Sequence, residues 1–217
     1  MSRWAVFDVD GTLFPPSSME KTFIGYMLKK GAIPPANIFY YFLTGCIRTI
    51  LTNYAEGFKN NKYYLKYLPV RPIQSAGRQF VNHYVWPRIS SVGRNQLRLY
   101  HQDGYRILIM SGSPDFLTYP LAAYLQPDLT IAADLEIKEN QFSGELSGLH
   151  PYGERKTILL KELAKKHAID FEESIVFANH HSDFHHMELF GKAIAVNPTI
   201  KLRRLAAKKG WKIEVWD

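Results

Sequence analysis

The chain has a single cysteine, Cys46, so no disulfide can form within it. It also lacks a long hydrophobic run, because its most apolar stretch, residues 38–51, contains Arg48 and is shorter than the ~20 residues that span a bilayer. Low-complexity tracts and internal repeats are absent as well. The first residues lead into a strand-like segment rather than into a signal peptide. These absences predict a globular protein of the reducing cytoplasm, without a transmembrane helix.

The length of 217 residues suits one domain, or one domain that carries a sizeable insertion. Apolar residues make up 46% and charged residues 22%, which is typical of globular rather than disordered proteins. The formal net charge of +7 predicts a surface that attracts anions, whether phosphate esters, nucleic acids or anionic membranes. Because the basic residues are spread singly along helix-like segments, we expect a solvated basic surface and no nucleic-acid partner.

Short apolar segments alternate with helical patterns over most of the chain. Strands are expected at residues 4–7, 106–110, 129–131, 174–177, 193–196 and 212–215. Helices are expected at 116–125 and 154–167, and a small hairpin at 136–146. This alternation predicts an α/β fold with a doubly wound, parallel, Rossmann-like sheet, which binds ligands beyond the carboxyl ends of its strands.

Residues 14–91 interrupt this alternation. Apolar residues recur there at helical spacing, and prolines divide the region. We therefore predict an α/β core of residues 1–13 and 92–217 and an inserted all-helical cap of about four helices at 14–91. The aromatic stretch at 37–51 has two interpretations. It forms the interior of the insertion, which we favour, or it holds an apolar substrate or touches a membrane.

Polar clusters follow three of the expected strands. Asp8 and Asp10 follow the first strand, Ser111 to Ser113 follow the second, and Asn179 to Asp183 follow a later one. In a doubly wound sheet these strand ends meet at one edge. Two carboxylates at such an edge can divide the work of nucleophile and proton donor, and their oxygens can also bind Mg²⁺.

Four segments resemble the signatures of the haloacid dehalogenase superfamily. They are Phe7–Leu13 (FDVDGTL), Ile109–Ser113, Gly153–Lys156 ahead of a helix, and Phe177–Asp183 with the Met187-Glu188 pair and Gly191 behind it. A helical insertion directly after the first signature is similar to the cap of the phosphoserine-phosphatase-like branch. Within that branch, the most similar pattern is that of bacterial phosphatases that range from amino-alcohol phosphate hydrolases to lipid-phosphate hydrolases. The resemblance therefore implies hydrolysis of a phosphate monoester, either a small organic phosphate or a lipid phosphate.

The resemblance also implies a role for each matching residue. Asp8 would attack phosphorus and become an aspartyl phosphate, while Asp10 would protonate the leaving oxygen and later activate water. Ser111, Gly112 and neighbouring backbone amides would hold the phosphoryl oxygens. Lys156 would neutralise charge on the nucleophile and on the transferring group.

Mg²⁺ would be held by Asp8, by the backbone carbonyl of Asp10, and by Asn179 and Asp183. Relatives usually carry aspartate at the position of Asn179 and serine or glycine at that of His180. An amide oxygen has no formal charge, so Mg²⁺ should bind more weakly here. The alternative hypothesis is a catalytically weakened pseudophosphatase that still binds phosphate.

Two further groups of residues have open roles. His180 and His181 are candidate imidazole ligands, but we expect His180 to face the cap or the leaving group, and His185 and His186 to lie on a short surface helix. In the cap, Glu20 is a candidate partner for an amino group on the substrate. The cap cations that are candidates for an acidic substrate are Arg48, Lys59, Lys62, Lys66, Arg71 and Arg88.

Overall fold

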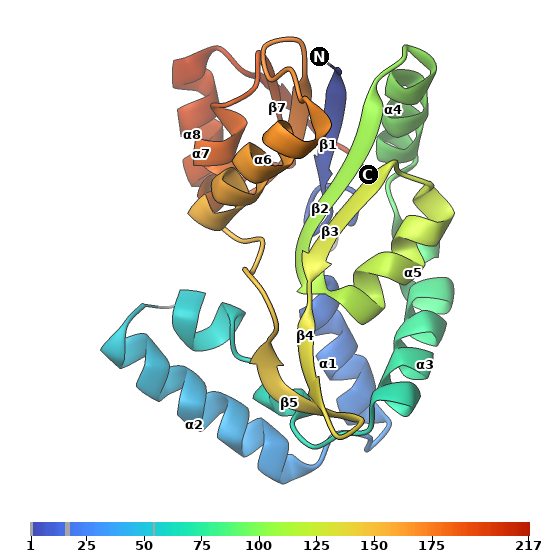
Figure 1. Cartoon of the computed structure of the whole chain (residues 1–217), viewed down its shortest axis with the longest axis vertical. Helices are drawn as coiled ribbons and strands as arrows, with labels where there is room; N and C mark the ends of the chain where they lie inside the picture. The colour runs from blue at the N-terminus through green and yellow to red at the C-terminus, as the bar shows by residue number, and fades with distance from the viewer. Residues whose placement is uncertain (1, 16–17, 54) are drawn as a thin grey trace.

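The computed structural model describes residues 2–15, 18–53 and 55–217. Six strands form one sheet in the order β3-β2-β1-β6-β7-β8, and every neighbouring pair is parallel (Figure 1). The strands are β1 (Trp4–Asp8), β2 (Arg106–Pro114), β3 (Leu129–Ala133), β6 (Ile175–Ala178), β7 (Lys192–Val196) and β8 (Lys212–Glu214). The chain adds strands on one side of β1 and then on the other, so β1 and β6 flank the switch point at which such sheets bind ligands. The predicted α/β fold is confirmed.

Strand β1 is the centre of the sheet, and all five of its residues are buried. Its side chains alternate between the two faces, so Ala5 and Phe7 belong to one apolar cluster and Trp4 and Val6 to the other. Phe7 stacks on Phe177 of β6, with the ring centroids 4.5 Å apart. Because both faces are covered, the strand is a continuous apolar run in the sequence rather than an alternating one.

Helices cover both faces of this sheet. One cluster includes side chains of α6, α7 and α8, whereas the other includes side chains of α4 and α5. Figure 1 shows these two groups on opposite sides of the strands. The bounds are α4 (Ser91–Gln102), α5 (Asp115–Leu125), α6 (Glu154–His167), α7 (Phe184–Met187) and α8 (Ile200–Lys209).

Between β1 and α4 lies a helical region. It contains α1 (Met19–Lys29), α2 (Pro35–Leu51) and α3 (Val70–Phe80), together with the short helical segments η1 (Ala55–Lys59), η2 (Tyr63–Leu65), η3 (Val81–Val85) and η4 (Trp86–Arg88). Phe23 of α1 packs edge-on against Phe116 of α5, with the ring centroids 5.2 Å apart. This contact attaches the helical region to the core.

The predicted hairpin is confirmed as β4 (Leu135–Lys138) and β5 (Gln141–Leu146). Its two-residue turn has positive φ at Glu139 and Asn140, as the tight turns of hairpins require. The hairpin extends from the core to the helical region, where the amide of Tyr67 donates to the carbonyl oxygen of Phe142 at 2.8 Å.

The interpretation of residues 37–51 as protein interior is wrong for most of α2, because Gly45 is its only buried residue among those described. Large apolar side chains, including Phe39, Phe42 and Ile50, are exposed. The physical reason is that Ile38 and Tyr41 alone supply the large apolar contacts with the core, while polar and small residues fill the rest of the inward side, where the Asn61 amide donates to Thr44 at 2.9 Å. Within the described ranges, no helix is both long and apolar enough to cross a bilayer.

Candidate active site

The carboxylate of Asp8 lies at the end of β1, where a tight turn begins. Gly11 has a φ of +84° in this turn, and the amides of Thr12 and Phe14 both donate to the carbonyl oxygen of Val9. The Thr12 hydroxyl donates back to Asp8 Oδ2 at 3.0 Å. The turn therefore holds a buried carboxylate in a fixed orientation at the edge of the sheet.

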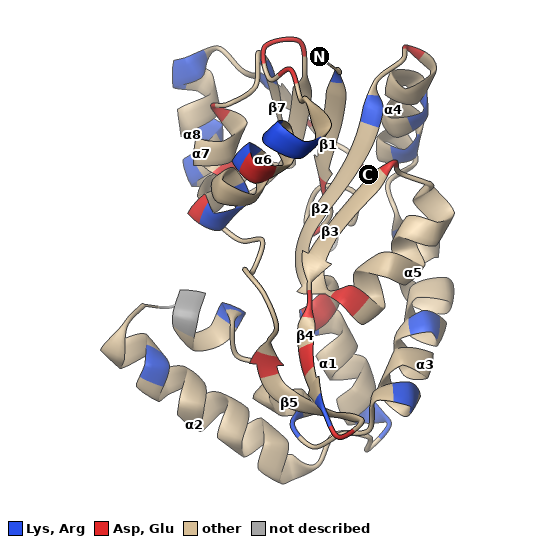
Figure 2. Cartoon of the chain, in the orientation of Figure 1, with Lys and Arg blue, Asp and Glu red and all other residues tan. Residues whose placement is uncertain are grey.

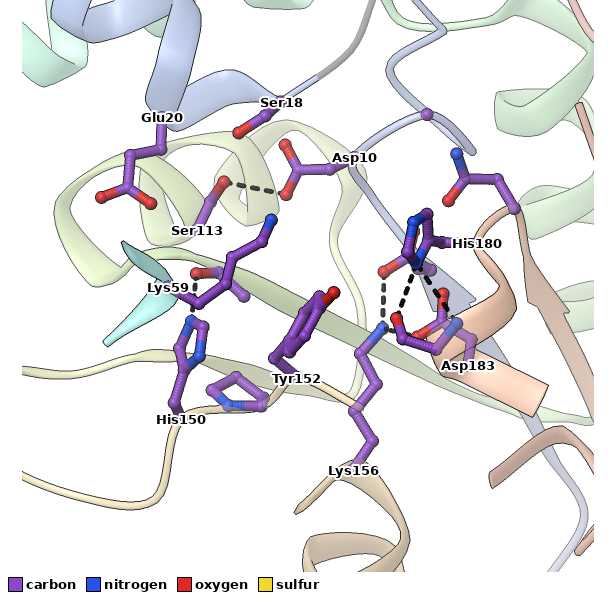
Figure 3. Close-up of a pocket in the computed structure, with 16 residues that line it drawn as sticks. Asp10, Ser18, Glu20, Lys59, Ser113, His150, Tyr152, Lys156, His180 and Asp183 are labelled. Atoms are coloured by element: carbon purple, nitrogen blue, oxygen red, sulfur yellow. Dashed lines mark hydrogen bonds and ion pairs between the residues drawn. The ribbon is translucent and has the colours of Figure 1, made fainter. Parts of the chain in front are cut away.

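Lys156, on the first turn of α6, bridges two carboxylates. Its Nζ lies 2.6 Å from Asp8 Oδ1 and 3.0 Å from Asp183 Oδ1, and all three side chains are buried (Figure 3). Burial opposes the charge on Lys156, but Asp183 and Asp8 outweigh it and raise the lysine pKa. The lysine is therefore charged.

The two bridged carboxylates differ in their electrostatics. Burial raises the pKa of Asp8, partly offset by Lys156, and Asp183 and Asp10 raise it further. Burial would raise the pKa of Asp183 too, but Lys156 and His186 outweigh it and hold the pKa of that carboxyl below its usual range. Asp183 is thus ionised beside the lysine, whereas burial disfavours the charged form of Asp8.

Asp10 faces the same cavity, and hydrogen bonds from two elements hold it in place. The Met19 amide at the start of α1 donates to Oδ1, while the hydroxyls of Ser111 and Ser113 donate to Oδ2 at 3.1 and 2.8 Å. Burial raises the pKa of Asp10 despite these bonds. A raised pKa keeps more of a carboxyl group protonated, which suits a group that gives and takes a proton.

The two serines after β2 differ in their access to the cavity. Gly112 and Ser113 line it, whereas Ser111 is fully buried and accepts a hydrogen bond from the Ser113 amide at 3.0 Å. The side chain of Ser111 thus contacts Asp10 rather than open space. Ser113, to which the sequence analysis gave no role, is the one of these two serines that lines the cavity.

Asn179, at the end of β6, lies directly against the first turn. A Cβ added to Gly11 would lie 1.9 Å from Asn179 Nδ2, so only glycine fits at position 11. Asn179 and Asp183 line the cavity together with Asp8. The predicted ligand set is thus gathered in one place.

The donor set around this cavity suits Mg²⁺ better than a softer metal. Among the described residues, no group of three or more His, Cys, Asp or Glu side chains could hold a metal by itself. The carboxylates of Asp8 and Asp183, the Asn179 amide and the backbone carbonyl of Asp10 are all hard oxygen donors. Lys156 carries one positive charge between two buried carboxylates, Asp8 and Asp183, which leaves negative charge that a divalent cation would neutralise.

The four histidines have different environments, and His181 lies beside His180, with the ring centroids 4.1 Å apart, but does not line the cavity. His180 lines the cavity, and its Nδ1 accepts from the Ser182 amide at 3.2 Å; burial lowers its pKa. His185 is exposed on α7 as expected, but the same expectation for His186 is wrong. His186 is buried with Nδ1 3.8 Å from Asp183 Oδ1, and burial lowers its pKa to about 3. The reason is that α7 is a single turn whose inner side packs on the core.

The helical region supplies the wall opposite Asp8. Glu20 of α1 accepts from Lys62 Nζ at 2.6 and 2.7 Å and from the Tyr64 hydroxyl at 3.0 Å. The carboxylate that the sequence suggested for a substrate amino group therefore already has a cation. Lys59 also lines the cavity, with its Nζ 4.8 Å from the centroid of the Tyr152 ring (Figure 3).

Other cap cations have partners elsewhere. Arg48 pairs with Glu145 of the hairpin, and Lys66 lies over the ring of Tyr63 at 4.4 Å. Among the six candidate cations, Lys59 is the one that borders the cavity.

Two residues that the sequence analysis missed complete the cavity, His150 and Tyr152. His150 Nε2 lies 2.9 Å from the carbonyl oxygen of Gly112, and burial lowers the pKa of the ring to about 3. The ring is therefore neutral, and its Nε2–H donates to this carbonyl. Only their position in the sequence could have pointed to these residues, because both lie within three residues before the Gly153–Lys156 segment.

Comparisons with known proteins agree with this geometry. A model of the haloacid dehalogenase-like hydrolases matches residues 5–188. A probable phosphatase of Mycobacterium tuberculosis is 24% identical over 222 residues, covering 96% of this chain and 74% of that protein. A histidinol-phosphatase of Neisseria meningitidis is 23% identical over 224 residues, covering 98% of both chains.

Solved structures share the fold. A protein of unknown function from Bordetella pertussis superposes with a TM-score of 0.81 at 20% identity, covering 99% of this chain and 98% of that one. A phosphoserine phosphatase, solved as a phospho-aspartyl intermediate analogue, superposes with a TM-score of 0.61 at 17% identity, covering 99% and 93%. Because the family model spans most of the sequence, the chain belongs to the haloacid dehalogenase-like hydrolases.

Proposed function

We propose that the chain is a Mg²⁺-dependent phosphatase that hydrolyses phosphate monoesters through an aspartyl phosphate on Asp8. The observation that carries this proposal is the Lys156 bridge between Asp8 and Asp183, with Asp10 on the same cavity. Family membership and the relatives named as phosphatases support the reaction class. The cytoplasm remains the proposed location.

In the proposed first step, an oxygen of Asp8 attacks phosphorus and the bond from phosphorus to the ester oxygen breaks. Asp10 donates its proton to that leaving oxygen, which its raised pKa favours. Lys156 stabilises the negative charge of the transferring group, because it is charged and buried beside the nucleophile. The products are the alcohol and an aspartyl phosphate.

In the second step, water attacks the phosphorus of the aspartyl phosphate and gives its proton to Asp10. The bond between phosphorus and the Asp8 oxygen then breaks, which releases inorganic phosphate and restores the carboxylate. The Ser113 hydroxyl and the backbone at Gly112 line the cavity near the expected phosphoryl oxygens. The carboxylates of Asp8 and Asp183, the Asn179 amide and the Asp10 carbonyl would hold Mg²⁺, which supplies further positive charge to the phosphoryl oxygens when bound.

The helical region at 14–91 is proposed to act as a cap that controls the access of water. Glu20 and Lys59 of this region line the same cavity as Asp8, which supports that role. Because Lys62 already neutralises Glu20, this carboxylate has no free charge with which to bind an ammonium group of the substrate. The cap therefore favours a leaving group that carries no ammonium group. Lys59 adds positive charge at the cavity, which favours a neutral or acidic leaving group. A small organic phosphate and a lipid phosphate both meet this description.

One observation favours the second candidate, a phosphate-binding protein with weakened turnover. Asn179 stands where relatives usually carry an acidic metal ligand, and the loss of one negative charge weakens Mg²⁺ binding. The remaining residues of the proposed machinery, Asp8, Asp10 and Lys156, favour the enzyme.

A screen of phosphate release separates the two candidates. Sugar, polyol, amino-alcohol and lysophospholipid phosphates are offered with Mg²⁺, with Mn²⁺ and with chelator, to the parent and to Asp8→Asn. The proposal predicts metal-dependent release from the parent with at least one ester and none from Asp8→Asn. Binding of phosphate without release from any ester supports the second candidate instead.

A further inference from the structure

The outward side of α2 is an exposed apolar surface. We call it the α2 outer face, and its large side chains are Phe39, Tyr40, Phe42, Ile47, Ile50 and Leu51. Ile50 is 84% exposed and Leu51 75%, so these two side chains are mostly surrounded by solvent. Spacings of three (39 and 42, 47 and 50), four (47 and 51) and seven (40 and 47) put them on one broad side of the helix. Contiguous exposed apolar patches of this kind mark interaction sites.

The amphipathicity of α2 is inverted with respect to an ordinary surface helix. Asn37 faces the protein and donates to the carbonyl oxygen of Lys66 at 2.7 Å, and Thr44 accepts from Asn61 at 2.9 Å. Arg48, the only charged residue of α2, pairs with Glu145 of the hairpin. These polar groups of the helix thus bind other parts of the protein, and the side of the helix that remains for a partner is apolar.

Charge is distributed unevenly between this part of the chain and the rest. Residues 14–91 contain ten lysines and arginines but only two acidic residues, a net charge of +8. Since the whole chain has +7, the remaining residues sum to −1. Figure 2 shows no acidic residue on the ribbon of α2. The apolar face therefore belongs to the part of the protein that carries all of its excess positive charge.

We propose that the α2 outer face docks on the surface of a lipid bilayer that contains anionic lipids. The helix would lie in the plane of the interface, with its aromatic and aliphatic side chains among the acyl chains. Basic residues of 14–91 would add attraction to anionic headgroups. A second copy of this chain fits less well, because a symmetric contact through α2 would bring two regions of net charge +8 together.

Sedimentation with vesicles tests this inference without using phosphatase activity. The parent is mixed with vesicles of phosphatidylglycerol and phosphatidylcholine, and with vesicles of phosphatidylcholine alone. The test variant is Ile50→Ser with Leu51→Ser. The matched control is Ile200→Ser with Val215→Ser, which removes two side chains of 74% and 76% exposure outside the helical region.

The inference predicts that the parent and the control bind the anionic vesicles, and that the test variant binds at least about tenfold more weakly, or about 1.4 kcal/mol. Binding should also weaken in high salt and on vesicles without anionic lipid. Equal binding of the test variant and the parent would overturn the inference. The inference would also be overturned if the parent did not bind vesicles but formed a dimer in analytical ultracentrifugation, and if the test variant did not form that dimer. Unchanged urea unfolding midpoints of both variants exclude misfolding as the cause.

Discussion

Replacing Lys62 with methionine removes the cation that neutralises Glu20 beside the cavity. The lysine side chain is 1% exposed and that of Glu20 is 16% exposed, so little water can replace the lost partner. Among the described residues, the Tyr64 hydroxyl remains as the hydrogen-bond donor to Glu20. The change therefore leaves a carboxylate largely desolvated in the wall of the helical region.

Loss of one partner of a buried ion pair costs about 3–5 kcal/mol. Because Glu20 has some exposure and keeps one hydrogen bond, we expect a loss of roughly 2–3 kcal/mol in the free energy of unfolding. The double variant Glu20→Gln with Lys62→Met removes both charges, and its stability should return to within about 1 kcal/mol of the parent.

Urea unfolding of the parent, both single variants and the double variant gives these values as a double-mutant cycle. A second measurement follows catalysis, because an unpaired Glu20 can bind an ammonium group. The kcat/KM for phosphoethanolamine, divided by that for glycerol phosphate, should rise about tenfold or more in Lys62→Met. Additive effects in the cycle, together with an unchanged ratio, would refute the role assigned to this pair.

Three further predictions concern the edge of the sheet. Asn179→Asp adds a negative oxygen ligand and should lower the Mg²⁺ midpoint of turnover; an unchanged midpoint in a Mg²⁺ titration contradicts position 179 as a ligand. Because burial raises the pKa of Asp8, its carboxylate should protonate as the pH falls, and turnover should decline on the acid side. Mg²⁺ binds the ionised form of Asp8, so at higher Mg²⁺ the decline of turnover in acid should move to lower pH. A decline that stays at the same pH argues against Asp8 as nucleophile and ligand. Gly11→Ala puts a Cβ against Asn179 at positive φ and should cost on the order of 1–3 kcal/mol in urea unfolding; unchanged stability contradicts the close approach.

The sequence predicted the strands and helices of the core because their patterns are local. Residues 154–167 were expected as a helix and form α6 with the same bounds, and the hairpin was found from its alternation around Glu139 and Asn140. The candidate site was likewise accessible, because three of the four signatures lie at the end of a strand and the fourth opens a helix. A parallel sheet brings those strand ends together whatever the intervening chain does.

Other features depend on contacts that periodicity does not encode. The spacing in α2 shows which residues share a side of the helix, but not which side faces the protein. The partners Lys62 and Glu20 are 42 residues apart, and nothing local marks them as a pair. His186 is buried because a single turn of helix packs its inner side on the core, and one turn is too short for a periodic pattern.

The covalent phosphate on Asp8 can be tested by quenching the reaction in acid during turnover and mapping the peptides by mass spectrometry. The proposed mechanism predicts one added phosphoryl group on the peptide that contains Asp8. The group should disappear when the substrate is exhausted, and it should be missing from Asp8→Asn, which should also lack turnover. A parent that releases phosphate with no phosphoryl group on this peptide, or an Asp8→Asn variant that keeps its turnover, would contradict the mechanism.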